Sequence, residues 1–350
     1  MIKLRFVFRI GIIALCLVIV SACRPEGDVT SQAADAEPTS EKASTQIAEA
    51  TELLPTVTED SQPDFEGTIA FYSDMAGNPD IYVIQADGTG LTQLTDDPAF
   101  DDSPDLSPDG RRVVFLSARN DPDPQFPQFK YDIYVVNVDG TNLTQLTTTE
   151  VGEDHPSWSP DGSWILFDAD YDGDGFYEIY SLAADGTDLA RLTTGQQNDQ
   201  FGDWSPSGDR IAFSSDRNGS WDIFMMNADG SEVTPLTNDE DWELFPAWSP
   251  DGNWIAYNGL TPGSRNTDVF VMSSDGLDMV QLTSESGFDE NPSWSLDGEW
   301  IAYQHQSGGD FELYAVNPDN LEILQLFSFP SDELWPSWGI TSASSSAGSD

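Results

Sequence analysis

The sequence of 350 residues is poor in the residue types that most often carry chemistry. It has two cysteines, two histidines and 13 Lys and Arg against 62 Asp and Glu, a formal net charge of −49. So few cysteines exclude a fold held by several disulfides, and two histidines cannot supply a cluster of imidazoles around a metal. So acidic a surface repels nucleic acid and attracts cations, and no nucleic-acid partner is expected.

Sequence signatures of common enzymes are also missing. The chain contains no G-x-S-x-G nucleophile elbow, no P-loop and no dinucleotide-binding fingerprint. Carboxylates are abundant, however, and a pair of them is all that a glycosidase needs. The sequence therefore favours a non-catalytic protein and leaves open a carbohydrate-active enzyme that works through carboxylates.

The N-terminus has the pattern of a secretion signal. Three positive residues precede the apolar run Ile10–Val20, which as a helix would span roughly 16 Å, about half of the ~30 Å hydrocarbon core. The run ends in Val20-Ser21-Ala22-Cys23, which resembles the bacterial lipobox. We expect residues 1–22 to be a lipoprotein signal peptide and Cys23 to carry the lipid, so that the protein is secreted across the cytoplasmic membrane of a bacterium and lipid-anchored, facing the periplasm or at the cell surface. The alternative is an ordinary cleavage site that happens to precede a cysteine.

Two segments lack the apolar content of a folded unit. Residues 23–66 are rich in Glu, Asp, Ser, Thr, Ala and Pro, and residues 341–350 are mostly small and polar. Such composition cannot bury enough surface to order itself. We expect a disordered acidic linker and a disordered tail on either side of a folded region at 67–340.

The folded region is built from a repeat. One motif, HPSWSPDGSWILF at 155–167, recurs in altered form at four other places: 103–115, 201–213, 245–257 and 291–303. Each repeat contains four short segments of β-branched and aromatic residues, joined by Ser-Pro-Asp-Gly and Asp-Gly turns that suit tight hairpins. The fourth segment is expected at 91–95, 143–147, 189–193, 233–237 and 279–283.

The phase of the repeat predicts the architecture. The third segment occurs six times, but the first repeat begins at its second segment, residues 67–71, and the missing first segment stands at the far end, Trp335–Trp338. A ring explains this split, because the last strand then completes the first unit. The sequence therefore predicts an all-β fold: a six-bladed β-propeller of four-stranded blades, closed by the C-terminal strand, and a monomer.

The repeat also resembles a known family. Its pattern WSPDG, IAF, DIFMMNADGS and LT resembles the WD40-like (PD40) propeller repeats of the TolB family and, more distantly, the propellers of prolyl-oligopeptidase-type enzymes. The resemblance covers residues 67–340 and implies the propeller fold. Where that family has a folded N-terminal domain, this chain has the lipobox-like segment and the acidic linker, so the family's role in the envelope is not carried over.

Loops that vary between repeats are the expected binding face. In a four-stranded meander the Ser-Pro-Asp-Gly and Asp-Gly turns share one face, and the variable loops share the other, where binding is more common. The longest variable loop carries Phe126 and Phe129. These aromatics could bind a partner's groove or a sugar ring; the alternative is that they pack on their own blade.

Two positions of the repeat are acidic in all six copies. The first acid set lies three residues before the Pro of the innermost strand, or before Gly202 in the one copy without that Pro: Asp101, Glu153, Asp199, Glu243, Asp289 and Glu333. The second acid set precedes the third strand: Asp80, Asp132, Glu178, Asp222, Asp268 and Glu312. The first set could form a ring at the channel mouth that binds a cation or a basic peptide. The alternative, which the second set favours, is that both brace the repeat through hydrogen bonds.

One loop has the spacing of a calcium site. The segment 170–178 reads D-x-D-x-D-G-x-x-E, with Asp170, Asp172, Asp174 and Glu178 as candidate oxygen ligands for Ca²⁺. It is not an EF-hand, because Ser181 stands where the twelfth-position Glu is required. Against the site, Glu178 belongs to the second acid set. No other cofactor is predicted.

The function expected from these features is a non-catalytic scaffold in the cell envelope that binds a protein or a glycan. A pull-down from envelope extract and a glycan-cleavage screen distinguish it from the carbohydrate-active alternative.

Overall fold

The computed structural model describes residues 63, 65–121, 130–260, 266–307, 309–329 and 331–341. The predicted signal peptide, Cys23, Phe126 and Phe129 lie outside these ranges, so their roles stay predictions. Within the ranges there is no helix with the length and apolarity that crossing a membrane requires.

The elements of the described residues are all strands, and their positions repeat. The innermost strands are β4 (Asp101–Leu106), β8 (Glu153–Trp158), β12 (Asp199–Trp204), β16 (Glu243–Trp248), β20 (Phe288–Trp294) and β24 (Glu333–Gly339). The second strands are β1 (Thr68–Ser73), β5 (Arg112–Ser117), β9 (Trp164–Ala169), β13 (Arg210–Ser215), β17 (Trp254–Leu260) and β21 (Ile301–Ser307). The third strands are β2 (Asp80–Gln85), β6 (Asp132–Asn137), β10 (Glu178–Ala183), β14 (Asp222–Asn227), β18 (Thr267–Ser273) and β22 (Asp310–Val316). The outermost strands are β3 (Thr92–Gln93), β7 (Thr144–Gln145), β11 (Ala190–Arg191), β15 (Thr234–Pro235), β19 (Met279–Gln281) and β23 (Ile323–Phe327).

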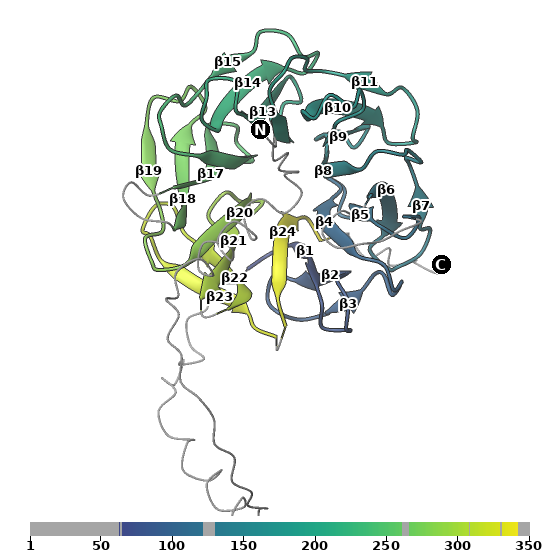
Figure 1. Cartoon of the computed structure of the whole chain (residues 1–350). Coiled ribbons are helices and arrows are strands. Elements are labelled where there is room, and N and C mark those ends of the chain that lie inside the picture. The colour runs from purple at the N-terminus through teal and green to yellow at the C-terminus, as the bar shows by residue number, and fades with distance from the viewer. Residues whose placement is uncertain are drawn as a thin grey trace, which may run out of the picture. The chain divides into compact units, whose positions relative to one another are not determined.

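These strands form a six-bladed propeller. Within the described residues there are six antiparallel sheets of four strands, arranged around a centre (Figure 1). Blade 1 has the order β24-β1-β2-β3, and blades 2 to 6 follow in chain order from β4, β8, β12, β16 and β20. The sequence prediction of fold class and blade number is confirmed.

Closure of the ring is also confirmed. Strand β24 pairs antiparallel with β1, with Ile69 opposite Trp338 and Thr68 opposite Gly339. The indole Nε1 of Trp338 donates to the carbonyl of Glu66 at 2.9 Å. Gly110, on the turn of blade 2, lies so near the chain after β24 that an added Cβ would meet the carbonyl oxygen of Ile340 at 2.2 Å. The C-terminal strand is therefore packed into both the first blade and the second.

The core lies between the blades rather than inside any one of them. Six apolar clusters each combine residues from two neighbouring sheets, and one of them joins blade 6 to blade 1 through Trp300, Leu313, Phe71 and Trp338. A sheet has two faces to cover, and in a ring each face is covered by the next sheet, so no blade needs a disulfide or a helix to bury it.

The outermost strands are shorter than predicted. Segments of five residues were expected, such as 91–95, but β3, β7, β11 and β15 pair over only two residues. After these, the hydroxyl of a repeated threonine replaces the backbone as acceptor: Thr95 Oγ1 accepts the N–H of Ile81 at 3.0 Å, and blades 2 to 5 repeat this bond. A side chain therefore closes the sheet edge, and the ladder ends early.

Candidate functional site

The first acid set is buried inside the blades. All six carboxylates are at most 5% exposed, and each contacts residues of its own blade or of the segment that enters it from the preceding blade. Asp101 accepts from Arg119 (3.0 Å) and Asp199 from Arg217 (2.7 Å), while Asp289 pairs with His305 (2.5 Å). The other three bind hydroxyls, as Glu153 does with Thr147 at 2.9 Å. These are the contacts of a brace; ligand binding by these acids stays a prediction.

Burial raises the pKa of several of these carboxyls. Desolvation brings the pKa of Glu153 to about 7 and those of Glu243 and Glu333 to about 8, against the hydroxyl bonds that lower them. The first acid set thus differs from a ring of ionised carboxylates at a channel mouth, because several members hold a proton near neutral pH.

The second acid set braces the sheets in the same way. In four blades a Gln on the outermost strand donates to it, as Gln93 does to Asp80 (3.0 Å) and Gln145 to Asp132 (2.9 Å). In blade 3 an arginine, Arg191, takes the place of that Gln and pairs with Glu178. The repeat-wide acids are therefore tied to the sheet edges that they support.

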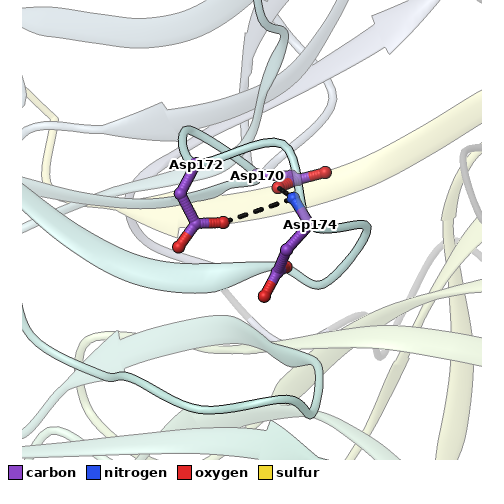
Figure 2. Close-up of side chains that lie close together, drawn as sticks. All are labelled: Asp170, Asp172 and Asp174. Atoms are coloured by element: carbon purple, nitrogen blue, oxygen red, sulfur yellow. Dashed lines mark hydrogen bonds between the residues drawn. The ribbon is translucent and has the colours of Figure 1, made fainter.

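The predicted calcium loop brings together three of its four acids. Carboxylate oxygens of Asp170, Asp172 and Asp174 lie within 4.8 Å of one another, and Figure 2 shows Asp170 and Asp172 converging on the backbone N–H of Asp174. Glu178 is fully buried and pairs with Arg191. Arg191 also donates to Asp172 at 2.7 Å and lowers the pKa of that carboxyl. The group is thus partly neutralised by an arginine, and calcium binding stays a prediction.

The innermost strands share a backbone feature at their centre. Each pairs with its second strand across a register shift, and the shift contains a residue with positive φ: Ser103, His155, Phe201, Phe245, Asn291 and Trp335, with φ between 49° and 59°. A non-glycine residue pays roughly 1–2 kcal/mol for this conformation. Such a bulge redirects a side chain, and here it does so once per blade at the centre of the ring.

The redirected side chains meet one another. The ring of His155 stacks on Trp335 with centroids 5.1 Å apart, and Phe201 lies 4.3 Å from His155 and 4.0 Å from Phe245. Phe245 in turn meets Trp335 edge-on at 5.3 Å. We call His155, Phe201, Phe245 and Trp335 the channel cluster. It joins blades 1, 3, 4 and 5 across the centre.

The histidine of the channel cluster is held by a carboxylate. His155 Nδ1 lies 3.0 Å from Asp168 Oδ1, and Gln200 and the N–H of Phe201 donate to the same carboxylate. Burial alone would lower the pKa of His155, but the Asp168 charge and hydrogen bond outweigh it and raise the pKa. The structure places this histidine in the wall of a cavity.

A cavity of about 330 Å³ lies against the channel cluster, and we call it the channel cavity. It is lined by the second halves of the innermost strands and reaches Pro250 and Leu296 in the Ser-Pro-Asp-Gly turns. This volume is in the range of small-ligand sites. Binding was expected on the variable-loop face, whereas this cavity extends to the face of the short turns.

Two carboxylates line the channel cavity. Asp105 accepts from the N–H of Trp158 (2.8 Å) and from Ser337 Oγ (2.7 Å), and Asp203 accepts from the N–H of Trp248 (2.8 Å). Desolvation raises the pKa of Asp105 to about 6 and the pKa of Asp203 to about 7. The negative charge of Asp105 also raises the pKa of Asp203. These two acids were missed from the sequence. The signal was available, because the other blades have Ser157, Ala247, Ser293 and Ser337 at this position.

Comparison with known proteins agrees with this geometry. Residues 171–342 match the model of the TolB beta propeller domain, PD40. An uncharacterized protein of Agrobacterium fabrum is 35% identical over 97 residues, which is 28% of this chain and 30% of that protein. A TolB homolog of Chlorobium luteolum is 28% identical over 29% of this chain and 31% of its own length. The chain thus spans about a third or less of these curated relatives.

Solved structures show the same fold. TolB from Acinetobacter baumannii superposes with a TM-score of 0.67 at 23% identity, over 79% of this chain and 68% of that one. An oligogalacturonate lyase in complex with manganese superposes with a TM-score of 0.54 at 15% identity, over 74% and 73%. The chain therefore carries a β-propeller whose residues 171–342 match the TolB-type domain, and it shares this fold with a TolB protein and with an enzyme.

Proposed function

We propose that this protein is a non-catalytic, lipid-anchored binding protein of the bacterial cell envelope, and that the channel cavity is where its propeller binds an envelope protein or a glycan. The observation that carries the proposal is the contrast at the centre of the ring. The brace residues are the same in most blades, whereas the six bulges present Ser, His, Asn, Trp and two Phe side chains, which converge on one cavity. Strained backbone that presents unlike side chains to a cavity is characteristic of a site rather than of a brace.

The aromatic wall supports binding of a partner. Phe201, Phe245 and Trp335 are only half-buried in the folded protein, so each keeps apolar area for a ligand to cover. Aromatic anchors in a central pocket carry much of the binding free energy in typical interfaces, and the same rings can stack on a sugar. The TolB-type fold supports an extracytoplasmic role of this kind by analogy alone.

Cross-linking of the protein in its native cells, followed by identification of the neighbours, tests the proposal. We expect one or a few envelope partners to be recovered repeatedly with the wild-type chain and lost with Trp335→Ala combined with Phe245→Ala. Trp254→Ala is the matched control, because Trp254 is 37% exposed on a second strand, away from the cavity. If the double variant and the control recover the same partners in equal amounts, the channel cavity is not the binding site.

The anchor is tested separately. Cells fed a radioactive fatty acid should label the wild-type chain and leave Cys23→Ala unlabelled. Equal labelling of the two chains contradicts lipidation at Cys23 and leaves the propeller's binding role untouched.

A carbohydrate-active enzyme is the second candidate. Two carboxyls on the innermost strands, Asp102 and Glu290, have a pKa raised by burial to about 7, which suits a general acid. The manganese-bound lyase on a similar fold makes this chemistry plausible for the architecture. A screen of polysaccharides decides it: a product that forms with wild type and disappears in Glu290→Gln, with no partner recovered by cross-linking, would overturn the binding proposal.

A further inference from the structure

The charge of the channel cavity is one-sided. Among the described residues that line it, Asp105, Asp203 and His155 are the ones that titrate, and none is Lys or Arg. Each aspartate oxygen can accept more than one hydrogen bond, while the structure assigns Asp105 and Asp203 one or two backbone and hydroxyl donors each. The wall therefore offers hydrogen-bond acceptors and negative charge.

The two aspartates exceed what the fold requires at their position. In two other blades serine does the same structural work: Ser293 Oγ accepts the N–H of Trp338 at 2.9 Å, and Ser337 Oγ accepts the N–H of Leu106 at 3.0 Å. The carboxylates of Asp105 and Asp203 make the equivalent bond to the next blade and add two charges whose desolvation is costly. A neutral side chain would hold the blades together equally well, so the charges call for another explanation.

A third acceptor at the same wall lacks a donor. Asn291, on the bulge of β20 and 7% exposed, lines the cavity and donates through Nδ2 to Gln304, but its Oδ1 has no hydrogen-bond partner. Buried polar atoms are normally paired, and an orphan oxygen marks a place where a donor is missing. The two adjacent blades present Phe245 and Trp335 at the same bulge position. The faces of these aromatic rings attract cations through the ring quadrupole.

These observations identify one class of ligand. We infer that the channel cavity binds an organic cation, an ammonium or guanidinium group, with its N–H donors on Asp105 and Asp203 and its charge against the aromatic rings of the channel cluster. The inference rests on the proposed binding function and names the chemistry that its site recognises. Such a group occurs on a free polyamine and on the lysine or arginine side chain of a basic segment.

An organic cation fits the wall better than a metal ion does. A hard divalent cation requires six or more oxygen ligands at about 2.0–2.6 Å, whereas much of this wall is Phe, Trp and Pro. Ammonium and guanidinium groups need fewer acceptors and gain from aromatic faces. The net charge of −49 also raises the local concentration of any cation near the protein.

Isothermal titration calorimetry on the full-length protein in detergent, at pH 8 and low salt, tests the inference with two probes, spermidine and acetyl-arginine amide. We expect one site for at least one probe, and a Kd at least about tenfold weaker in the variant Asp105→Ser, Asp203→Ser, because two charge-assisted hydrogen bonds are lost. Serine retains the bond to the next blade, and a thermal melt checks that the variant is folded. The variant Glu150→Gln, Glu240→Gln removes the same two charges from exposed positions and should bind as wild type does.

The two probes separate the sources of the cation. Binding of spermidine alone indicates a free polyamine, and binding of acetyl-arginine amide indicates a side chain of a basic segment; either supports the inference. Lowering the pH to 5.5 should weaken binding, because Asp105 and Asp203 gain protons while His155, the other titrating group of the wall, becomes positive. Asp168, Asp154 and Asp102 lie around His155 and oppose that last effect without reversing it.

Three results overturn the inference: no heat with either probe, equal affinity in the serine variant and wild type, or binding of manganese chloride that depends on Asp105 and Asp203 while neither amine binds. Failure here is distinguishable from failure of the proposed function. If the serine variant still cross-links to its partner and no amine binds, the cation inference is rejected and the proposed function stands. If an amine binds but no envelope partner is recovered, the scaffold role is rejected and the cation inference stands.

Discussion

The edges of the blades and the centre of the ring are built from the same repeat but follow opposite rules. At the edges the same residue type makes the same contact from blade to blade. In five blades a threonine hydroxyl accepts the backbone N–H of the first apolar residue of the third strand. Acids pair with the loops and the edge strands. At the centre the same strained backbone presents Phe in two blades and four other side chains in the rest. Repetition thus marks what holds the ring together, and departure from it marks where a ligand can be distinguished.

Breaking the closure of the ring should have the largest effect. Trp338→Ala removes a 6% exposed indole that packs between blades 6 and 1 and donates to Glu66. We expect a loss of about 3–5 kcal/mol in the free energy of unfolding and a Tm lower by roughly 10 °C. Trp254→Ala, which removes an indole that is 37% exposed, should cost about 1 kcal/mol or less. Similar melts for the two variants would contradict closure through β24.

The brace acids should affect stability and leave binding alone. Asp199→Ala leaves Ser215 and Arg217 without their buried acceptor and should cost about 3 kcal/mol of unfolding free energy. The amine Kd should stay within twofold of wild type. The serine variant of Asp105 and Asp203 should show the reverse, weak binding and a nearly unchanged denaturant midpoint. If Asp199→Ala abolished amine binding while still folded, the division between edge and centre would be wrong.

The same contrast predicts how stability depends on pH. Glu243 and Glu333 have a folded-state pKa near 8 that burial raises above the unfolded value, so the folded state binds the extra protons. Their contribution to stability is therefore complete below the unfolded pKa, near 4.5, and is lost as the pH rises through about 8. We expect Tm to be higher at pH 6 than at pH 9 by roughly 5 °C.

Charge repulsion in so acidic a chain acts in the same direction, so a variant is needed to isolate the two carboxyls. Glu243→Gln combined with Glu333→Gln should flatten the dependence of Tm on pH between 6 and 9. An unchanged slope would show that these carboxyls titrate normally in the folded protein.

The calcium loop should give the smallest effect. Arg191 already neutralises Asp172 and holds Glu178, so at best the site is weak. At tenfold excess over Kd, calcium should add about 1.4 kcal/mol, a rise in Tm of roughly 3–5 °C. Asp172→Ala should remove the rise, and Arg191→Met, which frees the carboxylates, should increase it. A Tm that changes neither with calcium nor with chelator excludes the site.

The sequence was sufficient to predict the architecture because closure leaves a mark in the order of segments. Trp335–Trp338 had no strand partner within its own repeat, and residues 67–71 had none before them, so only a ring paired both. The lengths of the outermost strands were less predictable. The apolar Leu91 continues the pattern of the fourth segment, yet it lies just before β3 and is 40% exposed. At the other end of the strand the Thr95 hydroxyl ends the ladder.

The site was only partly predictable, for a physical reason. A sequence pattern at period two assumes extended backbone, and the positive φ at His155 and Trp335 breaks that period where the side chains turn toward the centre. The repeats carry aspartate at 105 and 203 where three other blades have serine, a signal that was available in the sequence but not used. The repeated acids were the stronger pattern in the sequence, and the structure assigns them brace contacts.

A crystal structure of the full-length protein grown with excess spermidine at pH 8 tests the central claim most directly. The account predicts difference density in the channel cavity, with a nitrogen within hydrogen-bond distance of both Asp105 and Asp203 and the chain of the amine against Phe245 or Trp335. An empty cavity, with the amine ordered only on the first acid set or on the outer surface, would contradict it.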